Sequence, residues 1–202
     1  SGLPMLLCSL LVGRGIYTAE QAQQYFNGTE LSDPLLIADM DKAVQAIEEA
    51  VDNEVKITVY GDYDCDGVTS TVMLFTHLDA IGADVNWYIP TREEGYGLNE
   101  NAIRKLHEDG TGLIITVDNG VSAVNEAELI YELVVTDHHQ LPEILPKAEA
   151  IVNPHRQDDN SPYKELAGCG VALKLIMALE RDVEGVLEQY ADLAAIGTIG
   201  DV

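Results

Sequence analysis

The chain has 202 residues, of which 47% are hydrophobic, so it can bury a sizeable core in one or two domains. Its 11 basic residues against 35 acidic ones give a formal net charge of −24. This balance excludes a chain that holds a long polyanion by a basic surface of its own. If the substrate is a nucleic acid, metal ions or further segments must supply the positive charge.

The first hydrophobic run, "LPMLLCSLLV", is too short to span a bilayer and follows no basic segment, so we expect a docked helix and no membrane partner. The three cysteines, Cys8, Cys65 and Cys169, are odd in number and share no Cys-x-x-Cys spacing. We interpret them as reduced thiols, which predicts a cytoplasmic protein. The chain starts without Met and stops after "IGTIGDV", so we expect a fragment of a longer protein.

The chain opens with a predicted helical lead, residues 1–35, with short helices over residues 3–12 and 18–26. An amphipathic helix starts near Asp39, and strands and helices alternate from there. The expected strands cover residues 55–60, 84–90, 113–117, 133–136 and "AEAIVNP". The expected helices start after Gly67 and cover "NENAIRKLHEDG", "SAVNEAELI" and residues 166–180, 183–190 and 191–199.

This alternation is typical of an α/β fold. We predict a doubly wound, mostly parallel sheet of about five strands with helices on both faces and a helical C-terminal third. One domain, residues 36–202, is expected to hold the whole sheet. In such a fold, ligands bind outside the carboxyl ends of the strands.

The segment "YGDYDCDGVTS" starts like an EF-hand calcium loop, with alternating acids closed by a glycine: Asp62, Asp64, Asp66 and Gly67. The twelfth position of that loop would be Met73, which cannot replace the bidentate glutamate. The segment also follows a predicted strand, whereas an EF-hand loop follows a helix. We therefore place these acids in a strand-to-helix turn.

Acidic and imidazole side chains follow three successive predicted strands: Asp62, Asp64 and Asp66, then Asp118, then Asp137, His138 and His139. Parallel strands end at one edge of a sheet, so we expect these groups to converge. Carboxylates that close together repel one another, and a divalent metal relieves the repulsion. Oxygen ligands with some imidazole favour Mn²⁺ or Mg²⁺. Each aspartate alone could equally be a turn residue, and Asp137 could be a helix N-cap.

The segments "GDYDCDGVTS", "VDNG", "TDHH" and "GTIGDV" resemble, in order and spacing, the motifs of the DHH phosphoesterase superfamily. Within it, "PTREEGYGLN" and "NPHR…LAGCGVALKL" resemble the RecJ-like bacterial single-strand exonucleases. The resemblance implies a two-metal site that hydrolyses single-stranded DNA from the 5′ end in repair and recombination. It also implies a second domain and an oligonucleotide-binding barrel after Val202, and a single-strand-binding protein or a helicase as partner.

By this resemblance, the metal ligands are Asp62, Asp64, Asp66, Asp118, His138 and Asp201. Asp64 and Asp118, with Asp62 beside them, would hold the first metal, and the other three ligands would hold the second with Asp118 as the bridge. Many members of the superfamily carry a ligand histidine four residues before the position of Asp64. Tyr60 stands there in this chain, and we interpret it as a phenol tucked behind the turn.

Two metals about 4 Å apart can activate a water and clamp the phosphate, so Asp118 and His139 are the predicted catalytic residues. Neighbouring side chains of an extended segment point in opposite directions. We therefore expect His138 to bind metal and His139 to contact the scissile phosphate. Gly168 and Gly170 open a helix whose amides could bind phosphate, or they could simply form a tight loop. Arg92 is expected to touch the nucleic-acid backbone.

Three other functions could account for acids and histidines at the strand ends. A nanoRNA or cyclic-dinucleotide phosphodiesterase, or a pyrophosphatase, would share the metal core. A non-catalytic scaffold on the nuclease fold would be expected to lose metal ligands, whereas all of them are present here. A flavodoxin-like phospho-receiver would need a lysine near a strand end, and none is evident after the predicted strands.

Overall fold

The computed structural model describes residues 2–27 and 31–201, and the chain divides into two compact units, Ser1–Ser32 and Asp33–Val202. Among the helices of these described residues, none is both long and apolar enough to cross a bilayer. All three cysteines are thiols, as the sequence predicted.

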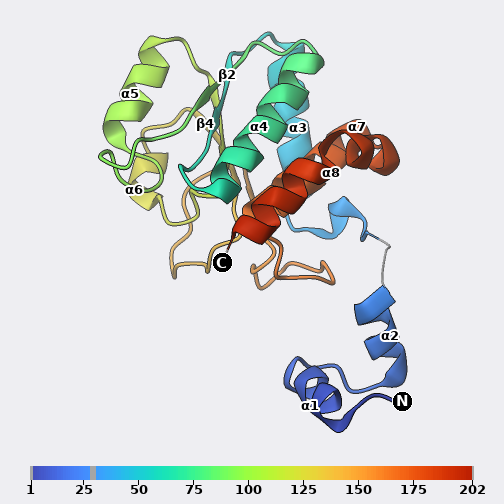
Figure 1. The fold of residues 1–202 in the computed structure, drawn as a ribbon. Helices are drawn as coiled ribbons and strands as arrows, with labels where there is room; N and C mark the ends of the chain where they lie inside the picture. Colours follow the sequence, from blue (N-terminus) through green and yellow to red (C-terminus); the bar gives the residue numbers. More distant parts are fainter. Residues whose placement is uncertain (1, 28–30, 202) are drawn as a thin grey trace. The chain divides into compact units, whose positions relative to one another are not determined.

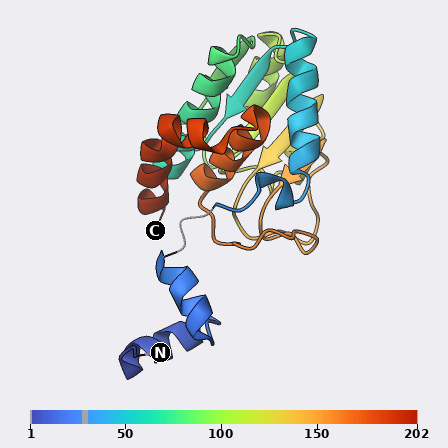
Figure 2. The same cartoon turned by 90° about the vertical axis from the view of Figure 1, so that its right-hand side faces the viewer.

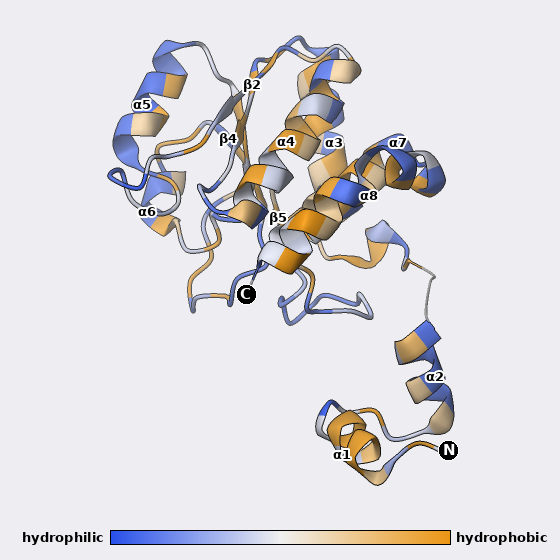
Figure 3. Ribbon diagram, viewed as in Figure 1, coloured by the Kyte–Doolittle hydropathy of each residue, from blue (hydrophilic) through white to orange (hydrophobic). Residues whose placement is uncertain are grey.

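The first unit contains two helices, α1 (Met5–Gly13) and α2 (Ala19–Asn27). The helical lead is therefore confirmed. Leu11 in α1 and Ala22 in α2 are buried. Figure 3 shows that α1 is hydrophobic along almost its whole length.

The second unit is built on a sheet whose strands are β1 (Ile57–Tyr60), β2 (Val85–Tyr88), β3 (Leu113–Val117), β4 (Glu132–Thr136) and β5 (Ala150–Val152). The strand order is β2-β1-β3-β4-β5, and every neighbouring pair is parallel. The predicted α/β fold is confirmed, with an all-parallel sheet where a mostly parallel one was expected. All strand carboxyl ends therefore lie at one edge.

Helices cover both faces of this sheet: η1 (Pro34–Leu36), α3 (Met40–Asp52), α4 (Cys65–Ala80), α5 (Glu100–Glu108), α6 (Val124–Ala127), α7 (Gly168–Glu180) and α8 (Val183–Gly200). Figures 1 and 2 show α3, α4, α7 and α8 on one face and α5 and α6 on the other. Leu113, Ile115 and Val117 of β3 pack in the first layer, and Ile114 packs in the second. Burial on both faces explains why the central strands are continuously apolar.

Two helices differ from the expectation in their bounds. α4 begins at Cys65 and not after Gly67, which places Asp66 in the first helical turn. α8 is one continuous helix where two were expected, because the residues around Tyr190 are compatible with helix and nothing there breaks it. The continuous α8 carries the chain back to the sheet edge, where Asp201 caps its end.

Small residues let α8 lie close to α4 and α7, beside which Figure 1 shows it. A Cβ at Gly197 would lie 2.3 Å from Oγ1 of Thr69 and 2.6 Å from Sγ of Cys169. A Cβ at Gly200 would lie 2.7 Å from Sγ of Cys65. The position of Asp201 therefore depends on these two glycines.

We expect Gly197→Ala to lower the free energy of unfolding by about 1–3 kcal/mol, because the added methyl overpacks the contact with α4 and α7. Urea-induced unfolding measures this loss. Gln189→Ala, at an exposed position of the same helix, is the control and should unfold within about 0.5 kcal/mol of the parent chain. Equal stability of both variants would contradict the close packing described.

Candidate metal centre

The turn between β1 and α4 holds the first group of acids. Asp64 is the N-cap of α4, and its Oδ1 accepts a hydrogen bond of 2.8 Å from the amide of Gly67. A Cβ at Gly67 would lie 2.7 Å from the backbone of Asp62, so only glycine fits. Asp62 is buried, and its Oδ1 has no hydrogen-bond partner among the described residues. Burial raises the pKa of Asp62.

Asp66 is bound by the amino end of α7. Its carboxylate accepts hydrogen bonds from the amides of Gly168 (2.6 Å) and Cys169 (2.8 Å). A carboxylate is stabilised there by the exposed amides and the helix dipole. The amide of Gly168 is thus directed at Asp66, and the phosphate contacts expected of Gly168 and Gly170 stay predictions.

Asp118 lies at the end of β3 in a left-handed backbone conformation, with φ of 62°. Its amide donates to the carbonyl of Thr136 (3.1 Å), and its carbonyl accepts from the hydroxyl of Tyr96 (3.1 Å). A Cβ at Gly168 would lie 2.6 Å from Oδ1 of Asp118, so α7 can approach this carboxylate only with glycine there. Burial raises the pKa of Asp118 to about 7, because the hydrogen bond with His138 that lowers it is outweighed by burial and the charges of Asp66 and Asp64.

His138 joins Asp66 of α4 and Asp118, which follows β3, to the end of α8. Its Nε2 lies 3.1 Å from Oδ1 of Asp118 and 3.8 Å from Oδ2 of Asp66. Its Nδ1 lies 3.8 Å from Oδ2 of Asp201. Burial lowers the pKa of His138, but the contact with Asp118 and the other two carboxylates outweigh it and raise the pKa to about 9.

Ligand atoms of three residue sets approach within 4.8 Å of one another: Asp62, Asp64 and Asp118; Asp66, His138 and Asp201; and Asp118, His138 and His139. The first two sets match the predicted division of ligands between two metals. Asp118 belongs to the first set and touches the second through His138. The structure thus brings all six predicted ligands to one edge.

The third set shows that one expectation was wrong. The rings of His138 and His139 lie side by side, with centroids 4.5 Å apart, whereas we expected them to diverge. The strand β4 ends at Thr136, so the alternation of side chains no longer holds two residues later. The division of roles between these histidines must therefore come from their partners.

Asp137 is not an N-cap, because no helix starts after it before β5. It is buried, and its Oδ1 accepts from the amides of His138 (2.7 Å) and His139 (3.1 Å). The same oxygen lies 2.7 Å from Nδ1 of His139, and Oδ2 accepts from the amide of Val121 (2.9 Å). Burial would raise the pKa of Asp137, but these contacts hold it below its usual value. Asp137 therefore fixes the ring of His139.

Tyr60 lies behind the turn, as expected from the sequence. It is fully buried, and its hydroxyl donates to the carbonyl of Gly97 (3.0 Å) and accepts from Nδ2 of Asn99 (3.2 Å). Its ring stacks on that of Tyr88, with centroids 5.1 Å apart. Burial raises the pKa of this phenol far above its usual value, and its hydroxyl is used in the contacts with Gly97 and Asn99.

Two further residues lie on the loop between β2 and α5. The guanidinium of Arg92 lies over the ring of Tyr63, 5.0 Å from its centroid, and its charge acts on Asp62. Tyr96 contacts both Asp118 and His139. Sequence reasoning missed Tyr96, although the segment "EGYGLN" that contains it carried part of the family resemblance.

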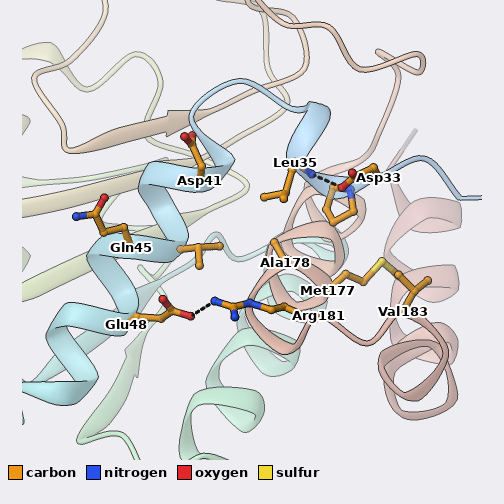
Figure 4. Close-up of a pocket in the computed structure, with 11 residues that line it drawn as sticks. Asp33, Leu35, Asp41, Gln45, Glu48, Met177, Ala178, Arg181 and Val183 are labelled. Carbon is orange, nitrogen blue, oxygen red and sulfur yellow. Dashed lines mark hydrogen bonds and ion pairs between the residues drawn. The ribbon is translucent and has the colours of Figure 1, made fainter.

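A cavity of about 530 Å³ lies elsewhere, between η1, α3 and α7 (Figure 4). Leu35, Val44 and Met177 form part of its apolar wall. At its rim, Arg181 pairs with Glu48 at 3.2 Å. None of the predicted site residues lines this cavity, so the chemistry is concentrated at the sheet edge.

A parallel sheet with carboxylates and histidines at three strand ends is typical of a metal-dependent phosphoesterase. The family model described as the DHH family, N-terminal domain, matches residues 56–198, and the chain belongs to this family.

The relatives are longer proteins. The chain is 45% identical over 204 residues to the single-stranded-DNA-specific exonuclease RecJ of Bacillus subtilis, a match that covers 98% of this chain and 26% of that protein. A crystal structure of exonuclease RecJ bound to manganese superposes with a TM-score of 0.75 at 39% identity, covering 86% of this chain and 45% of the other. RecJ of Thermus thermophilus in complex with Mg²⁺ gives a TM-score of 0.60 at 33% identity, covering 95% of this chain and 24% of the other.

Two glycines of α7 provide a matched test of the metal centre. We expect Gly168→Ala to weaken Mn²⁺ binding at least about 10-fold, because its methyl would displace the carboxylate of Asp118. At Gly170 a Cβ would meet only Leu166, at 3.2 Å, so Gly170→Ala should bind Mn²⁺ nearly as the parent chain does. Calorimetric titration compares the two variants. Equal affinities would contradict the close approach of α7 to Asp118.

Proposed function

We propose that this chain carries the catalytic centre of a metal-dependent phosphodiesterase that degrades single-stranded DNA as a 5′-to-3′ exonuclease in repair and recombination. The observation that carries the proposal is the pair of ligand sets at the sheet edge, which are joined by the contact between His138 and Asp118. The substrate class is supported by the names of the relatives, which are single-stranded-DNA-specific exonucleases. Because the chain covers 26% of the B. subtilis protein, it represents only part of such an enzyme.

The residues at the sheet edge fit a pair of Mn²⁺ or Mg²⁺ ions. Asp62 has a buried carboxylate oxygen with no hydrogen-bond partner among the described residues. Burial, together with the charges of Asp66 and Asp64, raises the pKa of Asp118 to about 7, so a cation would stabilise its ionised form. We assign Asp62, Asp64 and Asp118 to the first ion. Asp66, His138 and Asp201 would hold the second, and Asp118, which lies 3.1 Å from His138, would contribute to both.

When bound, two such ions supply an activated water and a clamp for the phosphate oxygens. The chain holds the ligands in place before any ion arrives. The amides of α7 fix the carboxylate of Asp66, and the N-cap bond to Gly67 fixes that of Asp64. This preorganisation removes the cost of gathering the acids during the reaction.

His139 is assigned to the scissile phosphate. The hydrogen bond to Asp137 raises the pKa of His139, so the imidazolium form is favoured. With Nδ1 directed at Asp137, the Nε2–H is left to donate to a phosphate oxygen as charge develops there. Arg92, which stacks on Tyr63 near Asp62, is assigned to the nucleic-acid backbone.

The proposal also covers how the enzyme binds DNA, where it is located and which proteins it contacts. Because this chain has a net charge of −24, we expect other segments to supply most of the binding energy for DNA. We place the enzyme in the cytoplasm, in keeping with its three thiols, and take a single-strand-binding protein or a helicase as its protein partner.

Asp118→Asn tests the proposal, since asparagine tolerates the left-handed backbone but cannot bridge two cations as an anion. We expect this variant to lose the rise in melting temperature that Mn²⁺ gives by mass action. It should also lose Mn²⁺-dependent release of mononucleotides from 5′-labelled single-stranded DNA. Asp79→Asn, at an exposed position of α4, is the control.

Full Mn²⁺ binding by Asp118→Asn would overturn the site. Comparing a long single strand, its duplex and a dinucleotide tests the substrate separately. Faster hydrolysis of the dinucleotide than of the long strand would indicate one of the alternative DHH phosphodiesterases.

Measurements of Mn²⁺ binding and of turnover should distinguish the roles of His138 and His139. We expect His138→Ala to lose Mn²⁺ affinity, because its Nε2 lies between two acidic ligands. His139→Ala should bind Mn²⁺ nearly normally but lose turnover by about 100-fold or more, which is typical when one charge-stabilising donor is removed. Calorimetry and single-turnover rates measure the two effects. If His139→Ala were the metal-defective variant, the roles would have to be exchanged.

A further inference from the structure

The loop between β2 and α5 reaches the metal centre through one phenol. The hydroxyl of Tyr96 donates to the backbone carbonyl of Asp118 (3.1 Å) and lies 3.2 Å from Nδ1 of His139. The two rings also meet edge to face, with centroids 5.7 Å apart and an angle of 73°. One side chain therefore touches the backbone of the bridging aspartate and the ring assigned to the phosphate.

The protons in this contact can be assigned. A phenol has a single proton, and the hydrogen bond to the carbonyl of Asp118 uses it. Towards His139 the oxygen of Tyr96 can then only accept. Nδ1 of His139 also faces Oδ1 of Asp137 at 2.7 Å, and this carboxylate oxygen is an acceptor as well. The network is consistent only if Nδ1 carries the hydrogen.

The backbone of Asp118 needs such support. Its φ of 62° lies in the left-handed region, which aspartate adopts more readily than most residues with a Cβ but still at a cost that surrounding contacts offset. The amide of Asp118 is held by Thr136, and its carbonyl is held by Tyr96. These two hydrogen bonds fix the backbone torsions on both sides of the Cα of Asp118 and thereby the direction of its side chain.

The loop is itself anchored from behind. Gly95 and Gly97 have φ of 93° and 78°, which lets the chain turn sharply on both sides of Tyr96. The buried hydroxyl of Tyr60 donates to the carbonyl of Gly97 and accepts from Asn99. Tyr60 thus helps to hold the loop that presents Tyr96.

We infer that Tyr96 is a positioning residue, which holds the backbone of Asp118 in its ligand-presenting conformation and orients the ring of His139. The inference rests on the proposed metal centre and adds to it a residue that touches no metal. Through Tyr96, the loop that carries Arg92 and Tyr96 supports the geometry of the metal centre. Contact of this loop with a substrate would therefore act directly on the bridging carboxylate.

Tyr96→Phe removes the hydroxyl and keeps the ring. We expect Mn²⁺ affinity to fall by about 3- to 10-fold, the effect of one neutral hydrogen bond. With bis(p-nitrophenyl) phosphate as a small phosphodiester, kcat should fall and KM should stay unchanged, because the phenol shapes the centre without binding this substrate. The matched control is Tyr88→Phe, which removes a hydroxyl bonded to Glu94 on the same loop. It should leave both quantities unchanged.

A double-mutant cycle tells whether Tyr96 affects Mn²⁺ affinity through its contact with Asp118 or through its contact with His139. If Tyr96 acts on the metal through Asp118, the affinity loss in Tyr96→Phe persists when His139→Ala is also present. Wild-type Mn²⁺ affinity and kcat in Tyr96→Phe would overturn the inference, as would an equal loss in Tyr88→Phe. Failure of the proposed site is distinguishable, since Asp118→Asn would then keep its Mn²⁺ affinity.

Discussion

Four buried aspartates, Asp62, Asp66, Asp118 and Asp137, at one edge of the sheet repel one another, and the arrangement of the site follows from how each is compensated. Backbone amides of α7 stabilise Asp66, and three amides with the ring of His139 stabilise Asp137. Asp118 is only partly compensated by His138, and Asp62 has an unpartnered oxygen among the described residues. Asp137, which orients His139, is thus fully satisfied by the chain, and Asp66 is satisfied by amides although it is also a proposed ligand. Asp62 and Asp118 are left for a cation to compensate.

The helices after the sheet complete the edge, and they can do so only through small residues. Gly168 lets α7 lie against Asp118, and Gly197 lets α8 lie against Thr69 and Cys169. These contacts place the amino end of α7 on Asp66 and bring Asp201 to His138. Packing on one face of the sheet is therefore coupled to the geometry of the ligands at its edge.

The sequence was sufficient for the features that follow from strand periodicity. Continuous apolar runs followed by acids predicted the parallel sheet and the convergence of Asp118 and His138, because parallel strands must end together. It was insufficient wherever a contact joins distant segments or the backbone leaves the strand. The bond from Gly168 to Asp66 spans 102 residues, the histidines lie beyond the last paired residue of β4, and Tyr96 reaches Asp118 from a loop. Such contacts depend on turn geometry that no periodicity encodes.

The two proposed ligand sets also differ in chemistry. The first contains only carboxylates, one of which, Asp64, is exposed, whereas the second includes the imidazole of His138. Oxygen ligands alone discriminate weakly between Mg²⁺ and Mn²⁺, and imidazole favours the transition metal. In this chain the buried Tyr60 stands where many members of the superfamily have a further imidazole, and it serves the loop of Tyr96 instead. We therefore propose the second set as the better Mn²⁺ site, whereas the first would rely on the charge of Asp118 to hold an ion.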